Sequence, residues 1–175
     1  PVQNVKRFLA THRLDIHLNS NLQLAFTETA IYGGQNATFD LSFLVPTNLY
    51  YDLQRNSDKP ISGLWAMDIY YKPKQNWQIY LQALIDDFII NNDPGIDDRA
   101  KHPNRLGMQF KVSNANVLFE GLSTSLTYTK VWNHTYQSRD SWENYHFKGL
   151  RLGYPYAAME ELKIKVGYWK FDKGW

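Results

Sequence analysis

The strongest constraint on this chain is a period-two alternation of apolar and polar residues that recurs along most of its length. In 77–88, for example, Ile79 and Leu81 alternate with Gln78 and Gln82. Because successive side chains of a β-strand point to opposite faces of a sheet, this pattern predicts strands with one apolar and one polar face. Seven stretches follow the pattern, near residues 7–18, 22–32, 61–72, 77–88, 104–113, 120–132 and 161–171.

The connections between these stretches alternate between short and long. The short ones, which contain the Asn, Ser and Pro residues of tight turns, are 19–21, 73–76 and 114–119. The long ones are 33–60, 89–103 and 133–160. In an antiparallel meander, alternate connections lie at opposite ends, so we expect short turns at one end and long loops at the other. Outer-membrane β-barrels show this asymmetry, and strands of this length match the thickness of the hydrocarbon core.

The composition excludes several other classes of protein. Aromatic residues make up 15% of the 175 residues, which argues against intrinsic disorder. The 19 Lys and Arg residues are nearly balanced by 17 Asp and Glu residues, so no nucleic-acid surface is expected. The longest stretch without these charged residues, Ile16–Thr27, is well short of the roughly 20 apolar residues of a membrane helix. The absence of cysteine excludes disulfides and thiolate metal sites.

These observations predict an all-β fold, an antiparallel up-and-down meander that forms part of a transmembrane outer-membrane β-barrel. Residues 1–175 are expected to form a single β-barrel domain. Single-chain bacterial barrels have even numbers of strands from eight upward, so an odd count predicts a fragment of a larger barrel. The alternative is a soluble antiparallel sheet with one face on a core, which gives the same alternation.

Three features fit the strand pattern less well. Phe39–Val45 is a possible extra strand, although Pro46 follows it directly. Glu28 falls on the face that holds Phe26. His12 falls on the apolar face in the middle of its stretch, and a β-bulge is the device that would turn it inward.

Specific strings of residues carry a resemblance to a known family. In chain order they are Arg7-Phe-Leu-Ala-Thr-His-Arg-Leu14, Ala30-Ile-Tyr-Gly-Gly34, Leu84-Ile-Asp-Asp-Phe88, Pro103-Asn-Arg-Leu-Gly107, Tyr128-Thr-Lys-Val131 with His134-Thr-Tyr136, and Leu152-Gly-Tyr-Pro155. Their order, spacing and residue identities resemble the outer-membrane barrel of the Wzi-type capsule assembly family, from about Arg7 to Tyr168. One departure is that this chain has Gly153-Tyr154-Pro155 where members commonly show a His-Pro pair.

The resemblance implies a function as well as a fold. Members of this family are larger barrels with additional strands on both sides of the matched region. The implied protein is non-enzymatic, lies in the bacterial outer membrane and holds capsular or other surface polysaccharide through its extracellular loops. Its expected partners are that polysaccharide, outer-membrane lipid, and the remaining strands of the same barrel or a partner chain.

The long connections supply candidate ligand-binding residues because they are rich in aromatic and amide side chains. Aromatic rings stack on the apolar faces of sugars, while Asn, Gln and His hydrogen-bond to hydroxyls. The expected polysaccharide-binding residues are Tyr50, Tyr51, Trp132, His134, Tyr136, Trp142 and Tyr145, with Gln54, Asn133, Gln137 and Asn144 as accompanying amides. The same residues can instead pack the loops together or form an aromatic girdle at the membrane surface.

An acidic group gives no case for catalysis or calcium binding. Its members are Asp86, Asp87, Asp93, Asp97 and Asp98. Asp86 and Asp87 are adjacent in a strand and point to opposite faces, so they cannot flank one glycosidic bond as a glycosidase pair does. The segment 91–98 lacks the spacing of an EF-hand loop. The preferred interpretation is a solvated loop, and neither catalytic residues, metal ligands nor cofactors are expected.

A row of charged residues is expected to face inward from the predicted strands. It consists of Arg13, Asp15, Asp68, Asp86, Arg105 and Lys111. Such a row can line a polar pore or form a salt-bridged lining that stabilises the wall. Two other functions therefore remain open beside polysaccharide binding: an outer-membrane channel or transporter with a polar lumen, and a soluble β-barrel carbohydrate-binding module.

Overall fold

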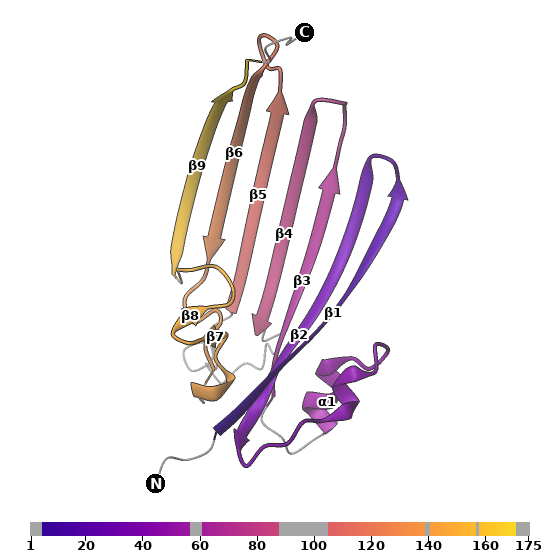
Figure 1. Cartoon of the computed structure of the whole chain (residues 1–175), viewed down its shortest axis with the longest axis vertical. Coiled ribbons are helices and arrows are strands. Elements are labelled where there is room, and N and C mark those ends of the chain that lie inside the picture. The colour runs from indigo at the N-terminus through magenta and orange to yellow at the C-terminus, as the bar shows by residue number, and fades with distance from the viewer. Residues whose placement is uncertain (1–4, 57–60, 88–104, 139–140, 157, 171–175) are drawn as a thin grey trace, which may run out of the picture.

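The structure is a computed structural model, and it describes residues 5–56, 61–87, 105–138, 141–156 and 158–170. It is dominated by one seven-stranded antiparallel sheet with the strand order β1-β2-β3-β4-β5-β6-β9 (Figure 1). The strands are β1 (Val5–Asn19), β2 (Leu22–Gln35), β3 (Ile61–Tyr71), β4 (Trp77–Asp87), β5 (Arg105–Ala115), β6 (Leu122–Val131) and β9 (Met159–Tyr168). The predicted all-β antiparallel meander is therefore confirmed, with each of the seven expected strands present.

The long connections contain short elements that the alternation did not reveal. Between β2 and β3 lie the 3₁₀ helix η1 (Leu41–Leu44) and the helix α1 (Tyr50–Asn56). Between β6 and β9 lie the 3₁₀ helix η2 (Ser141–Glu143) and a hairpin of β7 (His146–Phe147) and β8 (Leu150–Arg151). The possible extra strand at Phe39–Val45 is wrong, because the Asp40 side chain accepts a hydrogen bond from the backbone N–H of Ser42 and begins η1 instead.

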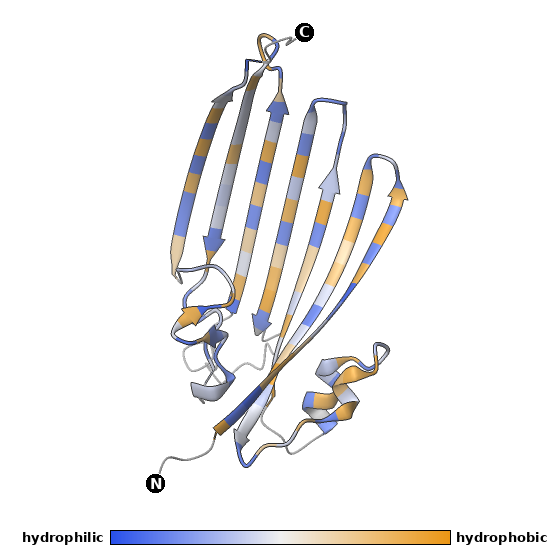
Figure 2. Cartoon of the chain, in the orientation of Figure 1, coloured by the Kyte–Doolittle hydropathy of each residue, from blue (hydrophilic) through white to orange (hydrophobic). Residues whose placement is uncertain are grey.

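The register of the strands gives the sheet one apolar and one polar face. Directly opposed residues share a face, and one such row is Leu14, Phe26, Met67, Ala83 and Met108. The next row along the strands lies on the other face and consists of Asp15, Ala25, Asp68, Gln82 and Gln109. Figure 2 shows the resulting alternation of hydrophobic and hydrophilic bands along the strands. We call these two surfaces the apolar face and the polar face.

Much of the apolar face carries large side chains that nothing in the described structure covers. Leu14, Met67 and Ile164 are 59%, 53% and 68% exposed. The same face exposes further large apolar residues, namely Ile16, Phe26, Leu81, Ile85, Met108, Phe110, Leu126, Leu162, Val166 and Tyr168. The sheet thus has no packed core over most of its area, and soluble proteins rarely expose an apolar surface of this extent.

The segment between β2 and β3 covers one end of the apolar face. Its Phe43 and Tyr50 form a buried cluster with Ala30, Tyr32 and Ile61 of the sheet. The rings of Tyr32 and Phe43 stack with centroids 3.9 Å apart. We call residues 36–56 the cover.

The cover explains why two polar residues, His12 and Glu28, lie on the apolar face of the sheet. His12 pairs with Glu28 in an unbroken register, and the β1–β2 irregularity lies between His17 and Asn19. The β-bulge invoked for His12 is therefore wrong: His12 stays on the apolar face, where its Nε2 lies 3.0 Å from the Glu28 carboxylate beneath the cover.

A second buried cluster lies on the polar face at the same end of the sheet. Tyr136 and Tyr145 from the connection between β6 and β9 pack there against Ile31, Leu64 and Val131. We call the described part of this connection, residues 132–138, 141–156 and 158, the inner loop. The short turns lie at the opposite end of the sheet, as Figure 1 shows, so the predicted division of short and long connections between the two ends agrees with the described ones.

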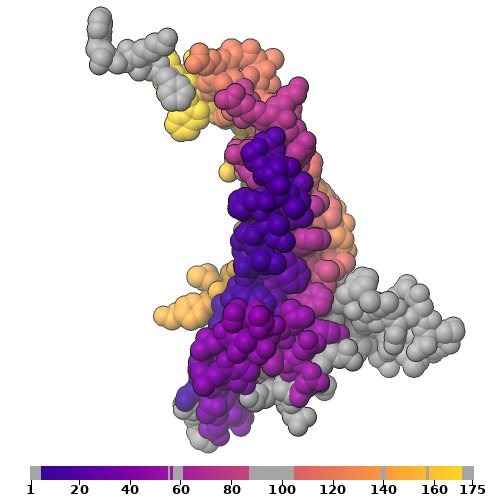
Figure 3. All heavy atoms as spheres, turned by 90° about the vertical axis from the view of Figure 1, so that its right-hand side faces the viewer, coloured from indigo at the N-terminus to yellow at the C-terminus, as the bar shows by residue number. Residues whose placement is uncertain are grey.

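The sheet is open in the part of the chain that the structure describes. There β1 pairs with β2 alone and β9 pairs with β6 alone, so no barrel closes. Viewed from the β1 side, the sheet is a narrow, curved layer with the purple cover near the viewer and orange atoms of the inner loop projecting to one side (Figure 3). Neither α1 nor another helix among the described residues meets the length and apolarity that a membrane-spanning helix requires.

Candidate ligand site on the polar face

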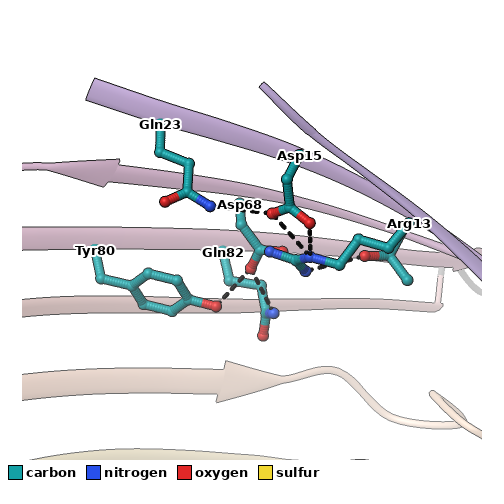
Figure 4. Close-up of polar contacts among 7 residues, drawn as sticks. Arg13, Asp15, Gln23, Asp68, Tyr80 and Gln82 are labelled. Carbon is teal, nitrogen blue, oxygen red and sulfur yellow. Dashed lines mark hydrogen bonds and ion pairs between the residues drawn. The ribbon is translucent and has the colours of Figure 1, made fainter. Parts of the chain in front are cut away.

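A hydrogen-bonded network of charged side chains occupies the middle of the polar face on β1 to β4 (Figure 4). Arg13 donates from Nη1 to Asp68 Oδ2 at 2.7 Å and from Nε to Asp15 Oδ2 at 3.0 Å. The other oxygen of Asp68 accepts hydrogen bonds from Tyr80 Oη at 2.5 Å and Gln82 Nε2 at 2.7 Å. Asp68 is only 4% exposed, so these donors satisfy a carboxylate that would be costly to bury alone.

This network accounts for three of the six residues in the expected inward row. Asp86 and Arg105, two further members, instead hold the inner loop against the sheet. Asp86 Oδ2 accepts a hydrogen bond from the Tyr136 backbone N–H at 2.6 Å, and Arg105 Nη1 donates to the Gln137 carbonyl at 2.7 Å. Asp86 lies within β4, in agreement with its predicted place in the strand 77–88.

Lys111, the sixth member, lies further along the polar face and lines a hollow near the short turns. Asp93, Asp97 and Asp98 of the acidic group lie outside the described residues. Among the residues that the structure does describe, no group of three or more His, Asp or Glu side chains is placed to hold a metal ion.

Tyr145 attaches the inner loop to the sheet through its side-chain hydroxyl. Its hydroxyl lies 3.1 Å from the carbonyl oxygens of both Thr29 and Ser62, between β2 and β3. Burial, together with the nearby Asp86 carboxylate, raises the pKa of Tyr145 far above its usual value. The phenol is therefore a neutral hydrogen-bond donor at any physiological pH.

Arg7 ties the inner loop to β1. Its guanidinium donates to the carbonyls of Asn144 and His146, the second at 3.0 Å. Burial and the positive charges of Arg151 and Arg7 lower the pKa of His146, so this imidazole is favoured in its neutral form. Asp86 and Arg105 thus hold the inner loop on the polar face at residues 136 and 137, and Arg7 holds it there at residues 144 and 146.

A hollow of about 470 Å³ lies between the inner loop and the sheet. Its walls combine tyrosine rings, aliphatic side chains and small polar groups. They are formed by Leu9, Thr11, Thr29, Leu64, Gln82, Leu84, Tyr136, Tyr145, Leu152, Gly153, Tyr154 and Pro155. This volume is in the range of small-molecule sites, and Gln82 joins the hollow directly to the Asp68 network.

Two residues of the inner loop shape the mouth of this hollow. Gly153 packs so closely on Tyr136 that an added Cβ would lie 2.4 Å from the Tyr136 ring. Tyr154 is half-buried and donates a hydrogen bond from its hydroxyl to Glu161. That hydrogen bond to a carboxylate raises the pKa of Tyr154.

The structure divides the predicted ligand-binding residues between the two faces of the sheet. Tyr136 and Tyr145 line the hollow on the polar face. Tyr50 and Tyr51 belong to the cover on the apolar face, where Tyr50 is buried against Phe43 and the Tyr51 ring lies 5.3 Å from that of Trp65. Neither Tyr50 nor Tyr51 lines the hollow that Tyr136 and Tyr145 share.

The remaining predicted residues lie in the inner loop outside the wall of the hollow. Trp132 is half-buried beneath the Lys130 ammonium, which is 5.1 Å from its ring centroid. His134 is exposed and has a positive φ of 65°. Trp142 is half-buried, and its Nε1 is near Gly34.

Sequence reasoning did not assign Thr11, Thr29, Gln82 or Tyr154 to a ligand site. The strand alternation places the first three on the polar face, but it gives no indication of which polar residues adjoin a folded loop. Tyr154 was part of a string that carried the family resemblance, and that string marks the mouth of the hollow.

Comparisons with known proteins add nothing to this geometry. No family model matches the chain, and neither a curated protein nor a solved structure matches it.

Proposed function

We propose that this chain forms part of the wall of a bacterial outer-membrane β-barrel and binds surface polysaccharide without catalysing a reaction, as the resemblance to the Wzi-type capsule assembly family implies. The observation that carries the proposal is the contrast between the two faces of the sheet. One face exposes rows of large aliphatic and aromatic side chains, whereas the other carries the Arg13–Asp68 network and the hollow under the inner loop. Membrane β-barrels have this outward-apolar, inward-polar alternation.

The chemistry of the hollow supports a saccharide as the ligand. Tyr154 offers an aromatic face at the mouth, and Thr11, Thr29 and Gln82 offer hydroxyl and amide groups nearby. This combination suits a molecule with both apolar C–H faces and hydroxyls. In the outer-membrane orientation, the end with the long connections faces the cell exterior, where surface polysaccharide is found.

The inner loop favours polysaccharide binding over a channel. It packs on the polar face through the Tyr136 and Tyr145 cluster and is held by Asp86, Arg105 and Arg7. A barrel built from this wall would have the loop inside its lumen, where it reduces the cross-section open to solutes. The exposed apolar rows likewise favour a membrane wall over a soluble carbohydrate-binding module.

Titration with the purified surface polysaccharide of the producing cells tests this function. We expect Tyr154→Ala in the vesicle-reconstituted protein to weaken binding about tenfold, the equivalent of roughly 1.4 kcal/mol. Tyr156→Ala is the matched control, because Tyr156 is 64% exposed in the same loop and does not line the hollow. Equal affinity of the wild type and the Tyr154 variant, or no binding by the wild type, would contradict the assigned site or the function.

A further inference from the structure

The cover presents apolar side chains on two opposite sides. On the side toward the sheet, Phe43 and Tyr50 are 5% and 2% exposed and fill the cluster with Tyr32 and Ile61. On the side away from the sheet, Leu41, Leu44 and Leu49 remain largely exposed, together with Val45. A surface segment in water needs only its inward side to be apolar, so the outward leucines have no role in packing against the sheet.

The outward side of the cover continues an apolar surface that the sheet already exposes. The covered row Phe8, Tyr32 and Ile61 lies on the same face as the exposed row Leu14, Phe26 and Met67, further along the same strands. The cover buries this row of the sheet but exposes its own leucines on its outer side. The apolar surface of the molecule therefore continues from the sheet onto the cover.

Glu28 gives an independent reason to expect an apolar medium at this position. It is 0% exposed and lies on the apolar face. Its carboxylate accepts hydrogen bonds from the backbone N–H groups of Tyr50 and Tyr51 at 2.9 Å and from Trp65 Nε1 at 2.8 Å, and His12 Nε2 lies 3.0 Å away. The cover thus conceals a charge that would be very costly against hydrocarbon.

From these observations we infer that the cover is an interfacial membrane anchor whose outward residues Leu41, Leu44 and Leu49 lie among lipid acyl chains at the boundary of the bilayer. The inference rests on the proposed function, because it requires the apolar face of the sheet to face lipid. It adds that the lipid contact extends beyond the strands onto the connection between β2 and β3. The anchor lies at the end of the sheet that carries the long connections.

Site-specific labelling tests the anchor directly, because the chain has no cysteine of its own. Single substitutions Leu41→Cys, Leu44→Cys and Leu49→Cys place an environment-sensitive NBD fluorophore on the outward side of the cover. Met67→Cys reports on the apolar face, and Leu150→Cys reports on an exposed site of the inner loop. Each labelled protein is reconstituted in phosphatidylcholine vesicles with and without lipid that carries a nitroxide on its acyl chain, and circular dichroism checks the fold.

We expect blue-shifted, strongly quenched emission at the three cover positions and at Met67, and water-like, unquenched emission at Leu150. Quenching at Met67 without quenching at any cover position would overturn the anchor and leave the membrane wall intact. Absence of quenching at Met67 as well would overturn both. Equal quenching at all five positions, Leu150 included, would also overturn the anchor, since it shows non-specific adsorption.

Discussion

Single residues decide how the two connections dock on opposite faces of the sheet. On the apolar face, the Glu28 carboxylate accepts from the first two backbone N–H groups of α1. On the polar face, Gly153 allows the later part of the inner loop to pack closely on the ring of Tyr136, which in turn packs on the sheet. Both contacts are specific enough to be tested by one substitution each.

Removing the Glu28 carboxylate is expected to release the cover. Glu28→Ala leaves the Tyr50, Tyr51 and Trp65 donors without their acceptor under a buried surface and should cost about 3–5 kcal/mol of unfolding free energy. Hydrogen exchange of the reconstituted protein should show faster exchange at residues 50–56, with little change in β5 and β6. The control is Glu120→Ala, in the exposed turn between β5 and β6. Unchanged exchange in α1 would contradict this role for Glu28.

A methyl group at Gly153 is expected to disturb the hollow. Gly153→Ala places Cβ within 2.4 Å of the Tyr136 ring, so the inner loop must shift, at a cost of about 1–3 kcal/mol. Thermal unfolding and polysaccharide titration should both record the loss. Gly107→Ala on β5 is the matched control, because its Cβ would meet Leu84 at an ordinary 3.5 Å. Equal stability of the two variants would show that the loop does not pack as described.

At the scale of the elements, we expect the attachment of the inner loop to the sheet to depend on pH. Burial raises the pKa of both Tyr136 and Tyr145 above the usual value of about 10. When the loop is detached, its phenols lose their protons from about pH 10 upward, whereas in the docked loop they keep them. The free energy that these two phenols contribute to docking is therefore fully present below pH 10 and decreases as the pH rises above it.

Protease sensitivity of the loop measures this dependence. Cleavage within residues 132–158 should accelerate between pH 10 and pH 11 in the wild type. Tyr145→Phe keeps the ring but cannot ionise, so its cleavage should be faster at neutral pH and should change less over the same interval. Parallel pH profiles for the two proteins would show that the Tyr145 phenol does not control docking.

The secondary-structure elements also show how much of the fold could be predicted from the sequence. The strands were predictable because period-two alternation is local, and no strand start differs from its predicted position by more than two residues. The cover was not, because its docking depends on tertiary contacts: Phe43 stacks on Tyr32, and Glu28 accepts from the first N–H groups of α1. Glu28 and His12 did indicate where the cover lies, because two polar residues on an apolar face need a partner segment that shields them. The division of the predicted tyrosines between two faces likewise depends on long-range packing.

For the whole molecule, the proposed function requires a sheet that separates lipid from a polar interior. A charge placed on the apolar face should therefore be costly, and the same charge on the polar face should not. Phe110→Arg is expected to destabilise the reconstituted protein by about 2–4 kcal/mol, while Gln109→Arg, one residue away on the polar face, should cost much less. The folded fraction in vesicles, followed against urea, measures the difference. Similar losses for both variants would contradict the assignment of the two faces.

The period of lipid contact along one strand tests the membrane wall most directly. Single cysteines placed in turn at the β5 residues Met108, Gln109, Phe110, Lys111, Val112 and Ser113 can each carry an NBD label in vesicles with acyl-chain nitroxide lipid. We predict quenching at 108, 110 and 112 and none at 109, 111 and 113. Uniform quenching, or none at any of the six positions, would contradict a sheet whose apolar face lies against the bilayer.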